Sequence, residues 1–208
     1  MQPILNLQSF ALGTLNIELF VPDPDAVRKG YEQEKRRDLE APFPFWAKVW
    51  PSAIAMASYL QQHPDIITGK KVLELAAGLG LPSIVAAHYA ETVCCSDHLE
   101  DAVDSARQNI LHNRLSNVDC KLYDWNDLPD VLFADILLMS DVNYEPAEFD
   151  QLIVLFEKFL LRGTTIILTT PGRIMAKEFV SRLDTWCVEK SEIPVNDDTI
   201  IFLYKLCL

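Results

Sequence analysis

Two acidic residues and a tyrosine stand directly after apolar, strand-like runs of the chain. Asp97 follows residues 92–96, and Asp141 and Tyr144 follow residues 134–140 in the run Asp-Val-Asn-Tyr. A carboxylate accepts hydrogen bonds from a sugar diol or an amine, and a phenol can both donate and accept. No histidine or cysteine pair has metal-ligand spacing, so these residues indicate acid–base or positioning chemistry without a metal.

A small-residue turn after another apolar run, residues 72–75, predicts a nucleotide-type pocket. Gly78 and Gly80 let a ligand approach the backbone, and a helix starting near Pro82 presents free N–H groups. The dinucleotide pattern G-x-G-x-x-G requires a third glycine where Ser83 stands. We therefore favour S-adenosyl-L-methionine, which lacks phosphates, and keep an NAD(P)-binding oxidoreductase as an alternative.

Acidic and aromatic residues near this turn suit the parts of that cofactor. Asp97 suits the ribose diol, Glu74 suits the amino-acid part or a loop N–H, and Asp124 and Trp125 suit the adenine. Simpler explanations remain open, because Asp97 is also placed to cap the next helix and Trp125 could be a core aromatic.

The order of apolar runs predicts an α/β fold, a Rossmann-like, doubly wound, mostly parallel sheet of seven strands with an antiparallel last strand. In such sheets, ligands bind beyond the carboxyl ends of the strands, where the acidic motifs fall. The expected strands are residues 72–75, 92–96, 118–122, 134–140, 164–170, 185–190 and 199–206. The expected helices are residues 51–62, 82–90, 99–115, 147–161 and 174–183. We expect a polar turn at residues 194–198.

The N-terminal part has a different pattern. Residues 4–21 predict a β-hairpin that turns at Gly13, and residues 25–40 predict a solvated helix in preference to a mobile cover. We expect two units: a hairpin and helical cover over residues 1–41, and one compact domain over residues 42–208.

Composition limits the partners. The net charge of −12 and pI near 4.7 argue against nucleic acid, and no apolar stretch approaches the roughly 18 residues of a membrane span. No N-terminal basic and apolar signal segment is present. The cysteines are expected to be free thiols in a reducing compartment, which favours a cytoplasmic protein, and we expect a monomer. They are Cys94, Cys95, Cys120, Cys187 and Cys207.

Several motifs together resemble the class I, seven-β-strand S-adenosylmethionine-dependent methyltransferases. Within that group the chain resembles the protein-lysine methyltransferases of the electron-transfer-flavoprotein β-subunit type. The resemblance implies that Trp50, Glu74, Gly78, Asp97 and Trp125 surround the cofactor and that Asp141 and Tyr144 face the acceptor. The matching segments are Phe45–Ser52, Val72–Gly80, Asp97, Asp141–Tyr144 and Pro171–Arg173.

The chain departs from this family at two positions. Ala76 replaces the usual first glycine of the turn, and Asn143 replaces a residue that is commonly apolar or aromatic. The first departure bears on cofactor affinity and the second on substrate choice.

We expect Trp46 or Phe45 to form an aromatic wall at the acceptor. Arg173 has two open interpretations, a contact to an acidic substrate segment or a solvated residue at a helix start. Asp141 and Tyr144 also have a purely structural alternative, as a cap and its packing partner.

The resulting prediction is an S-adenosylmethionine-dependent N-methyltransferase whose acceptor is a protein lysine. A small-molecule N-methyltransferase on the same fold is the nearest alternative, and a catalytically silent binding module is another. Methylation of a nucleic-acid base is disfavoured, because Val142 and Asn143 stand where those enzymes usually have two prolines.

Overall fold

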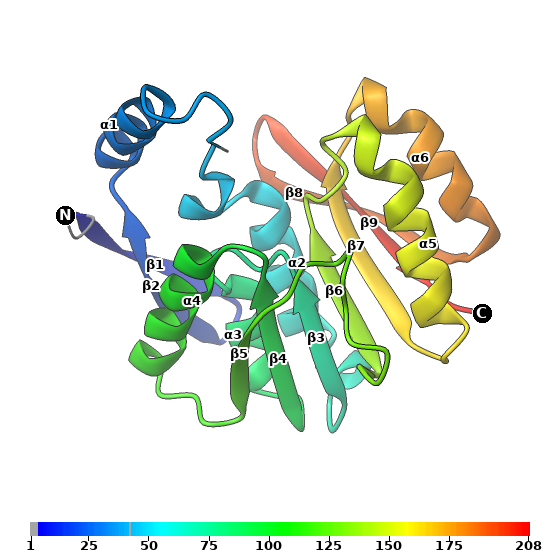
Figure 1. Cartoon of the computed structure of the whole chain (residues 1–208). Coiled ribbons are helices and arrows are strands. Elements are labelled where there is room, and N and C mark those ends of the chain that lie inside the picture. The colour runs from blue at the N-terminus through cyan, green and yellow to red at the C-terminus, as the bar shows by residue number, and fades with distance from the viewer. Residues whose placement is uncertain (1–3, 42) are drawn as a thin grey trace.

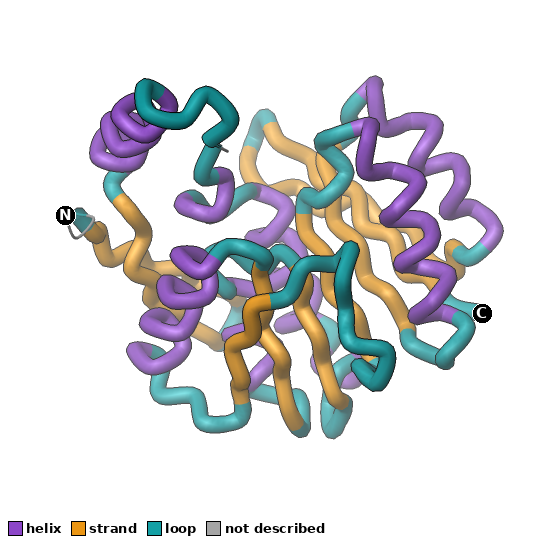
Figure 2. Tube along the Cα trace, in the orientation of Figure 1, coloured by secondary structure: helices purple, strands orange, loops and turns teal. Residues whose placement is uncertain are grey.

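The computed structural model describes residues 4–41 and 43–208. Residues 1–3, which begin the expected N-terminal unit, and Pro42, which begins the expected compact domain, lie outside the described residues. An N-terminal pair of strands and a helix precede alternating strands and helices (Figure 1, Figure 2). The strands are β1 (Leu5–Leu12), β2 (Leu15–Pro22), β3 (Lys71–Leu75), β4 (Thr92–Asp97), β5 (Val118–Leu122), β6 (Ile136–Ser140), β7 (Thr165–Pro171), β8 (Cys187–Asn196) and β9 (Thr199–Leu206). The α-helices are α1 (Pro24–Lys35), α2 (Pro51–Gln62), α3 (Leu81–Ala87), α4 (Glu100–His112), α5 (Phe149–Leu160) and α6 (Lys177–Arg182).

Strands β3 to β9 form one sheet in the order β5-β4-β3-β6-β7-β9-β8. Strands β3 to β7 are parallel, and β9 runs antiparallel to both of its neighbours. This arrangement confirms the expected Rossmann-like sheet with an antiparallel last strand. Strands β3 and β6 are neighbours, although β4 and β5 separate them in the chain, so the strand order switches direction between them.

Helices cover both faces of the sheet because consecutive strand residues point to opposite sides. Val72 of β3 packs with α2, α3 and α4, whereas Leu73 and Leu75 pack with α5 and α6. All three side chains are almost fully buried. The apolar runs of the parallel strands therefore supply two cores, one on each face.

The predicted hairpin and helix at the N-terminus are confirmed. β1 and β2 pair through the two-residue turn at Gly13 and Thr14, and Ile17, Leu19 and Val21 enter the same core as α3 and α4. Helix α1 follows, with the Asp23 carboxylate accepting from the Ala26 N–H at 3.0 Å. No residue of α1 is buried, and the helix projects away from the sheet (Figure 1).

The end of the chain differs from the sequence expectation. β8 extends to Asn196, so Pro194 lies inside a strand instead of opening a turn, and only Asp197 and Asp198 connect β8 to β9. Proline lacks an N–H and is tolerated on an edge strand. β8 is the last strand of the sheet, and its register shifts next to Pro194. Within the described residues, no helix has both the length and the apolar character needed to cross a bilayer.

Candidate active site

A cavity of about 670 Å³ opens beyond the carboxyl ends of β3, β4, β6 and β7. This volume lies within the roughly 300–1,000 Å³ of pockets that hold small ligands. The cavity sits at the switch in strand order between β3 and β6, where open α/β sheets bind ligands. The sequence-predicted residues that line it are Trp46, Trp50, Glu74, Gly78, Gly80, Asp97, Trp125, Asp141, Tyr144 and Arg173.

The floor of the cavity is the turn between β3 and α3. Ala76, Gly78 and Gly80 all have positive φ angles, of 56°, 53° and 81°. A Cβ atom at Gly78 would lie 3.3 Å from the Trp46 carbonyl oxygen, so a side chain there would press on the backbone that covers the turn. Ala76 adopts the left-handed conformation although it carries a methyl group. Glycine would adopt this conformation at lower energetic cost.

Glu74 anchors the helix that follows this turn. Its Oε2 accepts hydrogen bonds from the Ser83 backbone N–H, at 2.9 Å, and from the Ser83 hydroxyl. Glu74 is 1% exposed, and burial raises its pKa to about 8, although the bonds from Ser83 oppose the shift. Glu74 therefore holds the first turn of α3 and also lines the cavity, while its contact to the amino-acid part of a cofactor stays a prediction.

Asp97 joins two parts of the site. Its Oδ2 accepts from the Gly78 N–H at 3.0 Å, and its Oδ1 accepts from the Leu99 N–H at 3.2 Å, just before α4 begins. The His98 ring lies 3.4 Å from the same carboxylate, and the hydrogen bond to Asp97 raises the pKa of His98. Asp97 thus holds the start of α4 against the glycine turn while still lining the cavity.

The two residues expected at the adenine lie in different places. Trp125 lines the main cavity and an adjoining hollow of about 180 Å³, and its Nε1–H donates to Glu148 at 3.5 Å. Asp124 lines only the hollow, where its Oδ1 accepts from the Asn126 N–H at 2.8 Å. Trp50, at the start of α2, donates from Nε1 to the Phe45 carbonyl at 2.7 Å.

Asp141 and Arg173 form an ion pair inside the cavity. Arg173 Nη2 lies 2.5 Å from Asp141 Oδ1, and the Asp141 side chain is 11% exposed. Burial raises the pKa of Asp141, while the charge of Arg173 and its hydrogen bond lower it, with a net rise. Asp141 has a φ of 61°, and its backbone N–H donates to Thr169 at 2.8 Å. The backbone of β7 therefore holds this residue in a sparsely populated conformation.

Tyr144 completes the acidic end of the cavity. Burial raises its pKa, and so do the nearby carboxylates of Glu145, Asp97, Glu148 and Asp141. The phenol therefore keeps its proton near neutral pH. Its ring packs against Phe45, with 5.4 Å between centroids.

Two predicted substrate contacts are placed differently from the expectation. Asn143 is fully buried and accepts a hydrogen bond from the Thr170 hydroxyl, so its side chain stabilises the loop after β6 and does not line the cavity. Arg173 lines the cavity, but Asp141 already pairs with its guanidinium. Arg173 is therefore not a freely solvated residue, while its contact to an acidic substrate segment stays a prediction.

Aromatic rings form a continuous wall from α1 to the cavity. Tyr31 packs on Phe43, Phe43 on Phe45, and Phe45 on both Trp50 and Tyr144, with centroid separations of 4.9–6.2 Å. Phe43 and Phe45 are more than 40% exposed. Phe45 is thus part of this wall, which extends onto the surface, and Trp46 lines the cavity.

The sequence interpretation missed residues that act through these groups. Ser83 satisfies Glu74, and Lys48 lies 4.5 Å from the centre of the Trp50 ring. A further signal was available in α4, where Asn109 lies on the same face as Ala102, Ala106 and other buried residues. A polar residue on an apolar helix face is expected to have a buried partner.

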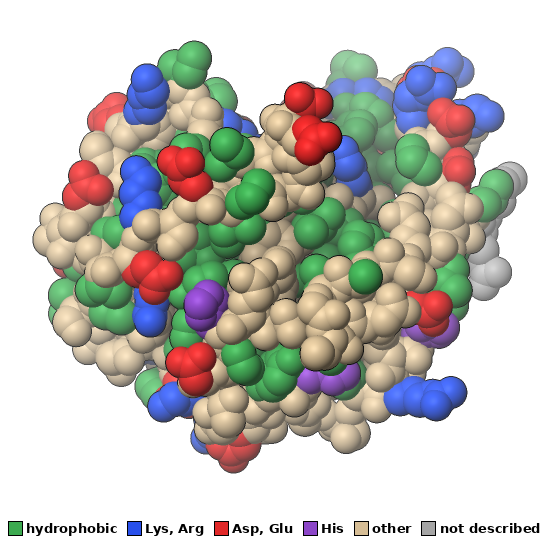
Figure 3. Space-filling model, turned by 180° about the vertical axis from the view of Figure 1, so that it is seen from behind, with side chains coloured by type: hydrophobic (Ala, Val, Ile, Leu, Met, Phe, Trp, Pro, Cys, Tyr) green, Lys and Arg blue, Asp and Glu red, His purple; other side chains and the backbone are tan. Residues whose placement is uncertain are grey.

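The face of the molecule opposite to that of Figure 1 shows how hydrophobic and charged side chains are distributed on the surface. Hydrophobic side chains cover much of its middle, and charged side chains lie mainly toward the outline (Figure 3).

Among the described residues, no group of acidic, histidine and cysteine side chains is arranged to hold a metal ion. The lining of the cavity includes carboxyl groups, a phenol and aromatic rings.

Comparison with known proteins identifies the family to which the chain is similar. A family model described as lysine methyltransferase matches residues 45–186. Histone-arginine methyltransferase METTL23 of Xenopus laevis is 37% identical over 119 residues, covering 54% of this chain and 50% of the relative. The protein N-terminal and lysine N-methyltransferase efm7 of Schizosaccharomyces pombe is 34% identical, covering 61% of this chain and 55% of the relative. The electron transfer flavoprotein beta subunit lysine methyltransferase of Danio rerio is 31% identical, with coverages of 64% and 52%. The chain thus spans about half the length of these relatives.

Solved structures share the fold at low sequence identity. The Thermus thermophilus 16S rRNA N2 G1207 methyltransferase, solved with AdoMet and guanosine, superposes with a TM-score of 0.64 at 14% identity, covering 98% of this chain and 51% of that one. A Pyrococcus horikoshii protein described as a putative RNA methyltransferase gives a TM-score of 0.59 at 17% identity, with coverages of 81% and 91%. At these identities the likeness concerns the fold alone.

Proposed function

Because the chain belongs to the lysine methyltransferase family, we propose that it transfers a methyl group from S-adenosyl-L-methionine to a lysine nitrogen of a protein. One observation carries the proposal. Asp141 and Tyr144, at the end of β6, line the same cavity as the glycine turn after β3 and Asp97 after β4. The proposed acceptor site and the proposed cofactor site therefore share one cavity.

The residues of the cavity fit the proposed cofactor. The left-handed turn at Gly78 and Gly80 leaves room for a ligand against the backbone, and Asp97 lies at the end of β4, where a ribose diol would be bound. Trp50 and Trp125 offer aromatic surface for the adenine. Asp97 places a carboxyl group in the cavity that would hold the cofactor, whose sulfur carries a positive charge.

The cofactor supplies an electrophilic methyl group, so the protein must align a neutral nitrogen with it and exclude water. Alignment of two reactants can provide roughly 7–11 kcal/mol of the barrier. The aromatic wall at Phe45 and Tyr144 shapes the approach of the acceptor. A cationic amine over these rings gains cation–π attraction before it loses its proton.

Asp141 and Tyr144 deprotonate and orient the lysine amine in this proposal. A lysine amine has an ordinary pKa of about 10.4 and must be deprotonated before it attacks. The Asp141 carboxylate accepts a hydrogen bond from the lysine ammonium and takes its proton. The Tyr144 oxygen accepts a hydrogen bond from a remaining N–H, which directs the nitrogen lone pair toward the methyl group. Arg173 pairs with Asp141 while no acceptor is present, so an incoming cation competes with the guanidinium for the same oxygen.

A protein arginine is a second candidate acceptor, since relatives at 35–38% identity are named histone-arginine methyltransferases. A small amine is less favoured, because the half-exposed rings of Phe43, Phe45 and Tyr144 make an open rim. The net charge of −12 supports the expectation that nucleic acid is not the substrate.

Three further expectations remain part of this proposal. The methyltransferase domain spans residues 42–208, supported by the family match from residue 45 and by the absence of buried residues in α1. The protein is cytoplasmic, supported by five free cysteines. It acts as a monomer, which size-exclusion chromatography with light scattering measures directly.

Two measurements test the function. Calorimetry with S-adenosylhomocysteine and with NAD should show binding of the first and not the second; binding of NAD alone would overturn the proposal in favour of an oxidoreductase. Radiolabelled methyl transfer into a lysate of cells lacking the protein should label a protein band. Acid hydrolysis of that band should yield methyl-lysine, whereas methyl-arginine would move the assignment to the second acceptor. A lysate without any protein label would contradict the protein acceptor.

A further inference from the structure

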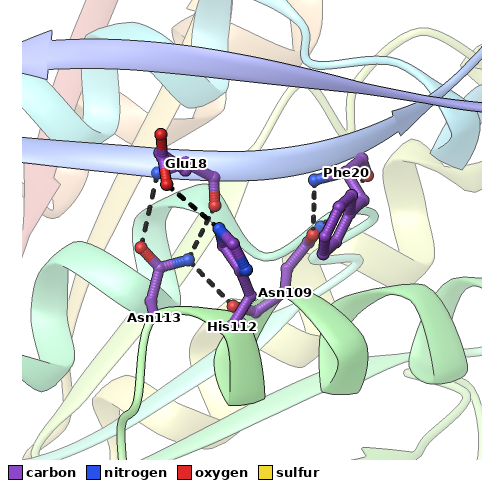
Figure 4. Close-up of polar contacts among 5 residues, drawn as sticks. All are labelled: Glu18, Phe20, Asn109, His112 and Asn113. Atoms are coloured by element: carbon purple, nitrogen blue, oxygen red, sulfur yellow. Dashed lines mark hydrogen bonds and ion pairs between the residues drawn. The ribbon is translucent and has the colours of Figure 1, made fainter.

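Helix α4 holds the N-terminal hairpin through two asparagines one turn apart (Figure 4). Asn113 accepts from the Glu18 N–H at 3.3 Å and donates to the Glu18 carbonyl at 2.7 Å. Asn109 accepts from the Phe20 N–H at 2.7 Å and donates to the Phe20 carbonyl at 3.4 Å. Each amide thus pairs with a residue on the open edge of β2 in the way that a neighbouring strand would.

Asn109 makes one bond that Asn113 does not make. Its Nδ2 also donates to the Leu79 carbonyl at 3.1 Å. Leu79 lies between Gly78 and Gly80, in the turn that forms the cavity floor. Asn109 is fully buried, so one side chain connects the hairpin, α4 and the glycine turn.

We propose that Asn109 is a positioning residue that couples docking of the N-terminal hairpin to the conformation of the glycine turn, and thereby sets affinity for the adenosyl cofactor. The inference rests on the proposed function, because it assumes that this turn holds the cofactor. Asn109 does not line the cavity and acts only through the Leu79 peptide.

The turn needs such a support because its backbone is intrinsically permissive. Residues flanking Leu79 are glycines with positive φ, which gain many alternative conformations when a constraint is lost. The Leu79 carbonyl would lose its hydrogen bond with Asn109, and a buried carbonyl without a donor is costly. The peptide would rotate toward another donor, and the N–H groups facing the cavity would rotate with it.

A second packing contact joins helix α4 to the glycine turn. Ala106, one turn before Asn109, lies so close to Gly80 that a Cβ there would be 3.4 Å from the Ala106 methyl group. Helix α4 therefore touches the turn at two successive positions. Since linkage is reciprocal, a ligand that orders the turn must also stabilise the docked hairpin.

The two asparagines provide a matched pair for the test. Asn109→Ala and Asn113→Ala each remove the bonds from an amide to β2, but only the first removes the bond to Leu79. We measure the Kd of S-adenosylhomocysteine by calorimetry, the melting temperature, and hydrogen exchange of residues 15–22 with and without S-adenosylhomocysteine, all on the full chain. Both variants should lower the melting temperature.

The coupling predicts different ligand responses. Asn109→Ala should raise the Kd about tenfold, equivalent to about 1.4 kcal/mol, whereas Asn113→Ala should change it less than threefold. Ligand should slow exchange in residues 15–22 of the wild type and Asn113→Ala, and leave Asn109→Ala unchanged. Equal effects of the two variants on Kd, or no ligand protection of the hairpin in the wild type, would overturn the inference.

A pair of isosteric variants guards against loss of the fold. Asn109→Asp keeps the acceptor for the Phe20 N–H and loses the donor to the Leu79 and Phe20 carbonyls. Asn113→Asp is the control, because it loses the corresponding donor to the Glu18 carbonyl and leaves the bond to Leu79 in place. If Asn109→Asp also fails to fold while Asn113→Asp folds, the residue is structural and the inference falls. A wild type that binds no S-adenosylhomocysteine would instead overturn the proposed function and this inference with it.

Discussion

Arg173 Nη2 lies 2.5 Å from Asp141 Oδ1, an ion pair in the lining of the cavity that joins the segments following the neighbouring strands β7 and β6. A group that binds Asp141 Oδ1 must therefore displace the Arg173 guanidinium. A carboxylate held in this way discriminates in favour of cationic acceptors, because a neutral group would gain less from replacing the guanidinium.

Asp141→Asn should remove the acceptor of the amine proton while preserving the shape of the side chain. We expect kcat/KM for methyl transfer to fall at least about 100-fold, the scale of a lost general base, and the Kd of S-adenosylhomocysteine to stay within about threefold. Turnover of the variant at the wild-type rate would show that Asp141 only closes a turn.

Arg173→Gln should shift the pH dependence of methyl transfer. Arg173 lowers the pKa of Asp141 against the effect of burial, so removal of its charge raises that pKa further. Because the ionised carboxylate is the active form, the acidic limb of the pH–rate profile should move to higher pH. Arg173→Lys keeps a positive charge and should leave the limb nearer to the wild-type position. An unmoved limb in Arg173→Gln would separate Arg173 from the titration of Asp141.

Tyr144→Phe should retain the ring packing on Phe45 and lose only the hydroxyl. We expect kcat to fall about tenfold, the equivalent of one hydrogen bond of about 1.4 kcal/mol, with little change in cofactor Kd. Tyr31→Phe, on α1 at the far end of the aromatic wall, is the control and should keep the wild-type kcat. Equal kcat values for the two variants would remove the hydroxyl from the mechanism.

Glu74→Gln should flatten the dependence of stability on pH. The pKa of Glu74 is raised from 4.5 to about 8, so its contribution to stability is fully present below pH 4.5 and is lost as the pH rises through about 8. Across that window the free energy of unfolding of the wild type should fall, by on the order of a few kcal/mol, relative to the variant. Urea unfolding at several pH values measures it, and exposed Glu157→Gln on α5 is the control. Parallel curves for wild type and Glu74→Gln would contradict the assignment.

Ala76→Gly should stabilise the protein, because φ is 56° at this position. Relief of the left-handed strain exceeds the entropy cost of glycine, and we expect a gain of about 0.5–1 kcal/mol in the free energy of unfolding. The neighbouring Ala77 has no positive φ, so Ala77→Gly should lose about 0.5–1 kcal/mol. Denaturant unfolding distinguishes the two, and a loss of stability in both variants would show that Ala76 is not strained.

Local patterns in the sequence are enough to establish the class of fold. Apolar runs with turn residues at their ends define β3, β4 and β6, and their order predicts the parallel sheet and the edge where ligands bind. The glycine turn, Asp97 and the Asp141–Tyr144 run are adjacent to those strand ends in the chain, so their gathering at one edge follows from topology. The edge position of Pro194 does not follow, because the order of strands in the sheet decides whether a proline is tolerated.

Side-chain partners were decided only by tertiary structure. Asp141 and Arg173 lie 32 residues apart, and nothing local indicates that they pair, nor that Asn143 turns inward to Thr170 while Tyr144 faces the cavity. The bond of Asn109 to Leu79 likewise spans 30 residues. Sequence determines which residues follow the parallel strands β3, β4 and β6, because that depends on local pattern. Hydrogen-bond and charge partners depend on distances that exist only after the sheet has brought remote segments together.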